Sequence, residues 1–210
     1  WGGASLLKRY VMARNRMRKQ GAVLRARDLR DNTVGRPCGY AVPGIGLVTD
    51  ASLRQAYYRH QIVSMAGAHL GRTLEIGAGF GGLCGTLMCR GHAEQYLIVD
   101  LPENMILAWF YLQTLLGEDI PLLSRQADMV EWPSSRVVIL APWLLPALAE
   151  RGVSVDLGIN IVSFQHMTFT NVSYYMSWLD ALRIRRLYLI NRDVKLEPHD
   201  VEISRYPLSP

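Results

Sequence analysis

The feature that most constrains this chain is a glycine-rich turn at residues 73–85, TLEIGAGFGGLCG. Glycines in such a turn let the backbone approach a ligand closely. Two nucleotide-binding patterns fit it, because Gly77, Gly79 and Gly82 match G-x-G-x-x-G while residues 75–81 match E-x-G-x-G-x-G. The turn therefore predicts a site for a dinucleotide or for S-adenosylmethionine, and the rest of the chain has to distinguish them.

Around this turn, short apolar segments that read as strands alternate with segments that read as helices. The expected strands are Arg72–Ile76, Gln95–Asp100, Val137–Leu140, Val155–Ser163 and Arg186–Asn191. The expected helices are Leu83–Arg90, Asn104–Leu116, Leu144–Glu150 and Thr168–Leu182. This alternation predicts an α/β, Rossmann-like fold with a mostly parallel central sheet and helices on both faces. Ligands of such sheets bind beyond the carboxyl ends of the strands.

The N-terminal part of the chain differs from this domain in charge. Residues 1–36 hold ten basic and two acidic residues, a net charge of +8, which leaves −3 for the rest of a chain whose total is +5. We expect a basic helical N-terminal arm over 1–37 and the α/β domain over 38–210. The arm is interpreted as a solvated helix face, although such a charge also suits an anionic partner.

The segment between the arm and the glycine turn predicts a hairpin followed by a helix. Residues 38–50 carry turn residues, and a helix is expected from there to about His69, capped by Asp50 or Ser52. The side chains expected to face inward are Leu53, Tyr57, Ile62 and Met65.

Two carboxylates bear on the choice of cofactor. Glu75 lies in the strand two residues before Gly77, where it suits the ammonium group of S-adenosylmethionine and would repel a pyrophosphate. Its alternative role is an ion pair with Arg72. Asp100 ends the second strand, where a carboxylate accepts hydrogen bonds from the ribose of either cofactor. Asp100 also suits the start of the helix that follows Pro102.

Several segments together resemble a known family. LEIGAGFGGL, YLIVDLPENMILAWFYL, INIVSFQHM and RLYLINR follow one another in this order, after LVTDASLRQAYYRHQI. From about Gly39 to Arg192, the chain resembles the bacterial sugar O-methyltransferase family of class I methyltransferases. The resemblance implies a Rossmann-like class I methyltransferase fold and S-adenosyl-L-methionine as cofactor. It also implies O-methylation of a hydroxyl on a sugar or a glycosylated small molecule.

The motif and the resemblance together give a set of cofactor-binding residues. Leu101 is expected to pack beside the adenine, and the resemblance places Tyr58 in a segment that covers the cofactor. The full expected set is Glu75, Gly77, Ala78, Gly79, Gly81, Asp100, Leu101, Ser163 and Tyr58.

Methyl transfer to a hydroxyl needs a base to take its proton, and His166 is the candidate for this catalytic role. It follows the strand 155–163, at a position where members of the family have Glu. A histidine bonded to backbone at the start of a helix is the alternative. Asn160, Gln165 and His60 are expected to bind the acceptor, although Asn160 is equally suited to satisfying buried backbone groups.

The remaining expectations concern partners and location. The three cysteines include no C-x-x-C pair, and the longest apolar run, 137–149, holds two prolines and is too short to span a membrane. We expect a cytoplasmic protein with a small sugar, nucleotide-sugar or glycoside acceptor and no nucleic acid, with a homo-oligomer left open. No metal is expected, since a solvated tail explains Glu197, His199, Asp200 and Glu202. Two alternatives remain, an NAD(P)-dependent oxidoreductase and a non-catalytic S-adenosylmethionine-binding module.

Overall fold

The computed structural model describes residues 25–193 and 201–207, together with residues 8, 11, 12, 15, 18 and 19. Its centre is a sheet whose strands follow the order β5-β6-β4-β3-β7-β8. The strands are β3 (Arg72–Ile76), β4 (Gln95–Val99), β5 (Leu122–Leu123), β6 (Val137–Leu140), β7 (Leu157–Ile161) and β8 (Leu187–Ile190). All neighbouring strands of this sheet pair in parallel, which confirms the predicted fold class.

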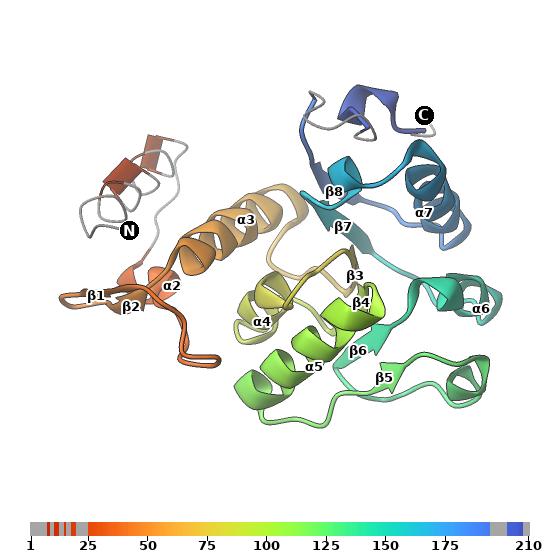
Figure 1. Ribbon diagram of the computed structural model, residues 1–210, viewed down its shortest axis with the longest axis horizontal. Helices are drawn as coiled ribbons and strands as arrows, with labels where there is room; N and C mark the ends of the chain where they lie inside the picture. Colours follow the sequence, from red (N-terminus) through yellow and green to blue (C-terminus); the bar gives the residue numbers. More distant parts are fainter. Residues whose placement is uncertain are drawn as a thin grey trace.

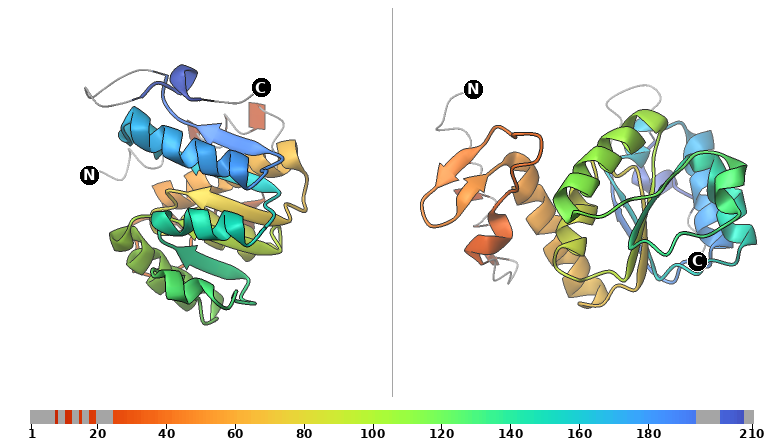
Figure 2. Two further views of the ribbon diagram at one scale, coloured as in Figure 1. Left: turned by 90° about the vertical axis from the view of Figure 1, so that its right-hand side faces the viewer. Right: turned by 90° about the horizontal axis from the view of Figure 1, so that it is seen from below.

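Helices cover both faces of the sheet (Figure 1). One face carries α3 (Asp50–Ala66), α4 (Gly82–Met88) and α5 (Pro102–Leu116), and the other carries α6 (Leu145–Glu150) and α7 (Phe169–Ala181). Figure 2 shows the two helical layers on either side of the strands. Because the strands are buried on both faces, they read as continuous apolar runs, and Val137–Leu140 is buried at every position.

A small N-terminal lobe, residues 25–49, extends from the α3 side of the domain (Figure 1). It contains α2 (Ala26–Leu29) and an antiparallel hairpin of β1 (Tyr40–Val42) and β2 (Gly46–Val48). Its apolar core joins Leu29 and Val48 to Leu53 and Ala56 of α3. The part of the expected arm that follows residue 24 therefore packs against the domain.

Ion pairs and hydrogen bonds fasten this lobe to the domain. The carboxylate of Asp28 lies 3.1 Å from an Arg59 nitrogen and 2.9 Å from an Arg90 nitrogen. Asn32 donates a hydrogen bond to the Tyr111 hydroxyl at 2.7 Å. Since Asp28 lies between two guanidinium groups, α2 is tied both to the middle of α3 and to the residues just after α4.

The sequence placed the start of α3 and one of its inward residues wrongly. Thr49 caps the helix in place of Asp50 or Ser52, because its hydroxyl accepts the Ser52 N–H at 3.0 Å while the Ser52 hydroxyl accepts the Thr49 N–H at 3.0 Å. Met65 is exposed, since the last turn of α3 only borders a surface groove beside β7 and β8. The expected helix within residues 1–37 lies largely outside the described residues.

Candidate functional site

A cavity of about 660 Å³ lies at the carboxyl ends of β3, β4 and β7. This is the switch point of the sheet, since the chain continues from β3 to β4 on one side and β7 lies on the other. Six of the expected site residues line it, namely Gly77, Gly79, Asp100, Leu101, Ser163 and His166. Residues that were not expected also line it, and they include Asn104, Trp143, Thr168, Asn171, Tyr174 and Tyr175.

Two glycines of the turn, Gly77 and Gly79, line this cavity, and the structure favours glycine at each position for a different reason. Gly77 has a φ of +76°, and a Cβ there would overlap the Ser163 side chain, so the ends of β3 and β7 approach closely only because it has none. Gly79 has a φ of +57°, and no atom lies within 4 Å of where its Cβ would be. Gly79 therefore leaves open space on the cavity side of the turn.

Ala78 and Gly81 support the turn from the side of the helices. Ala78 packs against the core under α4 and α5. A Cβ on Gly81 would come 2.8 Å from the Cδ1 atom of Leu112, so this glycine lets α5 pack close to the turn. Neither residue is among those that line the cavity.

Asp100 connects the second strand to the glycine turn. Its Oδ2 accepts the Gly79 N–H at 2.8 Å, and its Oδ1 accepts the Leu101 N–H at 2.8 Å and the Asn104 amide at 2.9 Å. A carboxylate offers about four acceptor positions, so three donors leave room for one more. Asp100 thus holds the turn in place and still presents an acceptor to the cavity.

Glu75 is buried beneath the turn and does not line the cavity. Its Oε2 accepts the Tyr96 hydroxyl at 2.8 Å. Burial raises the pKa of the Glu75 carboxyl to about 7, the Tyr96 hydrogen bond lowers it, and the nearby charge of Asp100 raises it. The alternative partner, Arg72, bonds instead to Gln95 at 2.7 Å and to the Ser154 carbonyl at 2.9 Å.

This buried carboxyl predicts a specific dependence of stability on pH. Because its pKa rises from 4.5 to about 7 on folding, its contribution is complete below about pH 4.5 and is lost as the pH rises through 7. Relative to Glu75→Gln, the free energy of unfolding of the natural chain should fall by about 3 kcal/mol over that interval. Urea unfolding of both proteins between about pH 4.5 and 7 would measure this difference. If the free energies of unfolding of the two proteins changed equally with pH, the folding of the chain would not shift the ionisation of Glu75.

His166 stands exposed at the cavity, in the loop after β7. Its Nε2 lies 3.1 Å from the Gln165 Nε2. The Gln165 Oε1 accepts the Arg192 N–H at 3.0 Å, which identifies the group facing His166 as the NH₂ of the amide. His166 Nε2 is therefore the acceptor, and in the neutral ring Nδ1 carries the proton.

Asn160 and Gln165, two of the expected acceptor-binding residues, are buried. The Asn160 amide donates to the Ile76 carbonyl at 2.9 Å, and its oxygen accepts the Phe164 N–H at 3.2 Å and the Asn191 amide at 2.9 Å. This is the alternative role expected for Asn160, the satisfaction of buried backbone. It joins the ends of β3, β7 and β8 behind the cavity.

The loop that presents Ser163 and His166 begins with a strained residue. Val162 has a φ of +58°, which is unusual for any residue with a side chain and costly for a β-branched one. Its N–H still donates to the Ile190 carbonyl at 2.6 Å. The strain lies where the chain leaves β7 beside the cavity, and backbone outliers of this kind cluster at functional sites.

Tyr58 and His60 lie on α3 and are not among the residues that line the cavity. Tyr58 packs against the core on the α3–α5 face, and its ring centroid lies 5.8 Å from that of Tyr57. Burial raises the pKa of the Tyr58 hydroxyl. The expected roles of both residues remain predictions.

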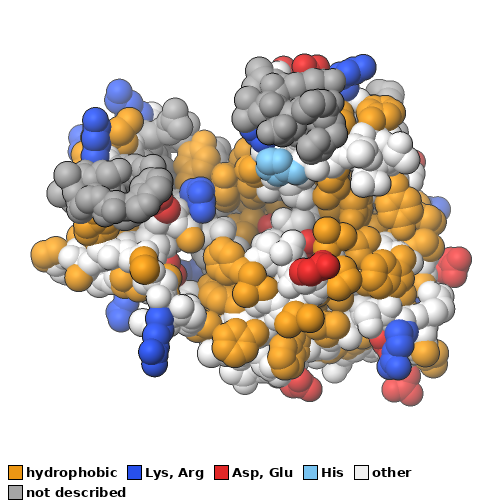
Figure 3. Space-filling view, viewed as in Figure 1, with side chains coloured by type: hydrophobic (Ala, Val, Ile, Leu, Met, Phe, Trp, Pro, Cys, Tyr) orange, Lys and Arg blue, Asp and Glu red, His pale blue; other side chains and the backbone are white. Residues whose placement is uncertain are grey.

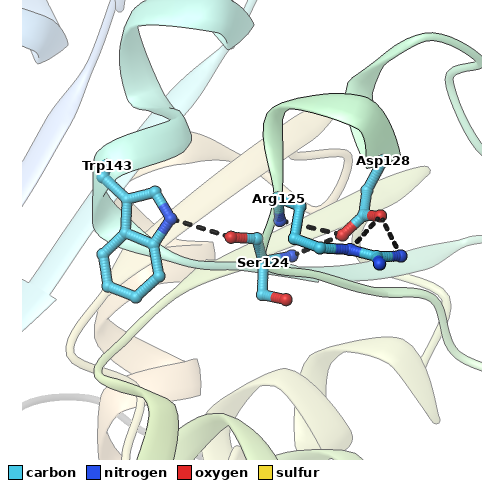
Figure 4. A network of polar contacts seen from close by, with 4 residues as sticks. All are labelled: Ser124, Arg125, Asp128 and Trp143. Carbon is cyan, nitrogen blue, oxygen red and sulfur yellow. Dashed lines mark hydrogen bonds and ion pairs between the residues drawn. The ribbon is translucent and has the colours of Figure 1, made fainter.

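Trp143 is the main residue of the site that the sequence did not single out. It follows β6, it is largely exposed, and its Nε1 donates to the Ser124 carbonyl at 2.8 Å (Figure 4). Leu101, also largely exposed, borders the same cavity. The position of Trp143 just after a strand, at the carboxyl edge of the sheet, is the signal that could have found it.

The carbonyl that holds Trp143 is itself fixed by a capped turn. Asp128 accepts the N–H groups of Ser124 and Arg125, each at 2.9 Å (Figure 4). These two backbone hydrogen bonds hold the pKa of Asp128 below its ordinary value. The indole therefore stands in a defined orientation at the edge of the cavity.

Neither a metal nor a membrane span is apparent in the described part of the chain. Within residues 25–193 and 201–207, no cluster of three or more His, Cys, Asp or Glu side chains is suited to hold a metal ion. In the C-terminal cluster, Glu197, His199 and Asp200 lie outside the described residues. No described helix combines the length and apolar character needed to cross a bilayer.

The comparisons with known proteins give structural likeness only. No protein-family model matches the chain, and no curated protein matches it. Among solved structures, the methyltransferase domain of bacterial CtHen1-CN aligns with 64% of this chain and 62% of its own, at 15% identity and a TM-score of 0.44. PH1948 of Pyrococcus horikoshii, described as a "putative RNA methyltransferase", aligns with 64% and 57%, at 15% identity and a TM-score of 0.38.

These comparisons correct the expected partners. Neither of the two proteins is described as a sugar methyltransferase, and one is described as a "putative RNA methyltransferase", so the expected exclusion of nucleic acid does not stand. The alignments span less than two thirds of either compared chain. The parallel sheet and its switch point give the chain a Rossmann-like α/β fold with helices on both faces.

Proposed function

We propose that this protein is an S-adenosylmethionine-dependent methyltransferase that transfers the methyl group to a hydroxyl oxygen. The observation that carries the proposal is the charge of the cavity. Its described lining includes the carboxylate of Asp100 and no Lys or Arg. S-adenosylmethionine presents a sulfonium and an ammonium, which a negative site attracts, whereas the pyrophosphate of a dinucleotide would be repelled.

The glycine turn supports the same choice of cofactor. In dinucleotide-binding folds the pyrophosphate lies against the backbone of this turn. Here the Gly79 N–H already donates to Asp100, and the carboxyl of Glu75 is buried below. An anion at the turn would meet two carboxyl groups and would have to displace one hydrogen bond.

The residues of the cavity fit the parts of S-adenosylmethionine. Asp100 would hold the ribose hydroxyls, and Leu101 and Trp143 would offer apolar surface to the adenine. The open side of Gly79 would leave room for the methionine end. A volume of about 660 Å³ falls in the range of ligand sites. The cofactor supplies the activated methyl group, and the chain orients the acceptor toward it.

His166 is the residue that we assign as base for the acceptor hydroxyl. Its Nε2 accepts from Gln165, so an acceptor hydroxyl would take the place of the Gln165 amide at that nitrogen. Gln165 keeps its oxygen on the Arg192 N–H, which limits how far its amide moves. Thr168 and Asn171 line the same side of the cavity and offer polar groups to the acceptor.

Calorimetric titration tests the cofactor directly. S-adenosylmethionine, S-adenosylhomocysteine, NADH and NADPH would each be titrated into the purified chain. We expect micromolar binding of the two adenosyl ligands and none of the nicotinamide cofactors. Binding of NADH or NADPH alone would overturn the proposal, and failure of all four would remove this cavity as a cofactor site.

Replacement of His166 by Ala should lower turnover about 100- to 10,000-fold, because general-base catalysis contributes roughly that much. The affinity for S-adenosylmethionine should stay unchanged. Transfer of a labelled methyl group to a panel of hydroxyl-bearing acceptors, RNA included, would measure turnover. His92→Ala is the control, since His92 lies half-buried at the amino-terminal ends of the strands, away from the cavity, where its Nδ1 contacts the Ala68 carbonyl. Unchanged turnover in His166→Ala would remove this residue from the mechanism.

A further inference from the structure

A second cavity, a groove of about 710 Å³, lies between the N-terminal lobe and helices α4 and α5. The glycine turn contributes residues both to this groove and to the candidate cofactor site. Gly77 and Gly79 line that site, whereas Phe80 and Gly82 line the groove. A molecule bound in the groove would therefore lie one loop away from the cofactor.

The lobe side of the groove carries basic side chains. Arg27 and Arg30 line it, are exposed, and form no ion pair with any residue that the structure describes. The charge of Asp28 in the groove wall is neutralised by Arg59 and Arg90. Residues 1–36, which end at this wall, have a net charge of +8. Figure 3 shows Lys and Arg side chains gathered around the lobe, on the left of the molecule.

The opposite wall carries aromatic side chains. Phe110 of α5 is 56% exposed, and no described ring packs on it. Phe80 and Tyr111 form an edge-to-face pair at 5.0 Å, and Tyr111 is fixed by the hydrogen bond from Asn32. Gln55 also lines the groove, and its amide oxygen has no hydrogen-bond partner among the described residues.

We infer that this groove binds a single-stranded segment of nucleic acid, with phosphates at Arg27 and Arg30 and a base stacked on Phe110. A basic groove with aromatic platforms is the arrangement by which proteins hold single strands. A duplex keeps its bases stacked inside and would leave Phe110 unused. The Asp and Glu side chains of an acidic peptide would pair with the arginines but offer no flat ring to stack on Phe110. That the bound strand is the methyl acceptor rests on the proposed function, whereas the binding itself does not.

Fluorescence anisotropy of a labelled single-stranded RNA of roughly 12 nucleotides, titrated with the full chain, tests this inference. The variant Arg27→Glu/Arg30→Glu should bind at least tenfold more weakly. Its plot of log affinity against log salt should be shallower by about 1.4, since about 0.7 is lost per phosphate contact. Phe110→Ala should weaken binding roughly 5- to 150-fold through loss of one stacked base.

Two matched controls accompany these variants. Arg183→Glu/Arg185→Glu makes the same change of charge as the groove variant. It does so at exposed positions between α7 and the edge strand β8, outside the groove. Ile106→Ala removes an apolar side chain that is 62% exposed on the same helix as Phe110 and does not line the groove. Both controls should bind RNA within twofold of the natural chain, and all variants should keep their affinity for S-adenosylmethionine.

The outcomes separate this inference from the proposed function. No binding of RNA by the natural chain, or equal weakening by the control pair, would overturn the inference. The inference would also be overturned if poly-glutamate competed with the labelled RNA as well as unlabelled RNA does and Phe110→Ala left RNA affinity unchanged. In those cases retained binding of S-adenosylmethionine would leave the proposed function standing. If the chain binds RNA but fails to bind S-adenosylmethionine, the proposed function is overturned and the inference about the groove stands.

Discussion

Replacing Gly77 by alanine is expected to weaken binding of S-adenosylmethionine and to destabilise the fold, because the turn that lines the cavity would have to move. The Cβ would overlap the Ser163 side chain, and the φ of +76° is unfavourable for alanine. The backbone penalty is about 1–2 kcal/mol and the overpacking about 1–3 kcal/mol. Calorimetric titration and urea unfolding of the variant would measure both losses.

Two further variants isolate the contact with Ser163. Gly91 has a φ of +66° and no atom within 4 Å of its Cβ position, so Gly91→Ala should show the backbone penalty alone and should bind the cofactor normally. Adding Ser163→Gly to Gly77→Ala should recover part of the lost stability. If Gly91→Ala lowers the free energy of unfolding as much as Gly77→Ala does, the close approach of β3 and β7 is not the reason that position 77 needs glycine.

The second large effect is expected for Asp100→Ala. The change removes the acceptor of the Gly79 N–H and the carboxylate that would hold the ribose. Hydrogen bonds to a charged group contribute about 1.5–3 kcal/mol each, so losing the one that Asp100 has room to accept from the ribose should weaken cofactor binding about 10- to 150-fold. The same titration would measure it.

Asn104→Ala is the control for this prediction. It removes one donor to Asp100, the 2.9 Å hydrogen bond, and leaves the carboxylate and the Gly79 contact in place. We expect a smaller loss, less than about tenfold, since this hydrogen bond only orients the carboxylate and its contacts to Gly79 and Leu101 remain. Equal losses in the two variants would mean that the order of the loop, not the carboxylate, determines the affinity.

The sheet could be predicted from the sequence because burial on both faces leaves continuous apolar runs. Arg72–Ile76 and Val137–Leu140 have the predicted bounds. The strand at Leu122–Leu123 was missed, since two residues carry no period. The exposure of Met65 could not be read from helical spacing either, because it depends on where the sheet ends beside α3.

The candidate site was predictable as far as the parallel sheet determines it. Because the carboxyl ends of parallel strands lie at one edge, Gly79, Asp100 and His166 come together at one cavity. Trp143 was missed because the apolar run around it reads only as a strand followed by a helix. The hydrogen bond of Gln165 to the Arg192 backbone, which selects the tautomer of His166, depends on a contact between distant segments.

Helix α3 belongs to two cores at once. Leu53 and Ala56 complete the core of the lobe, and Ile62 belongs to the core beneath the sheet. Among the described residues, the core of the lobe holds four buried side chains, and α3 supplies two of them. This core is small compared with that of the domain, and regions with few buried contacts open first. The proposed RNA groove therefore has one wall, formed by α4 and α5, that belongs to the large core, and one wall, formed by the lobe, that belongs to the small core. Helix α3 takes part in both cores. We therefore expect the lobe to open before the α/β domain does.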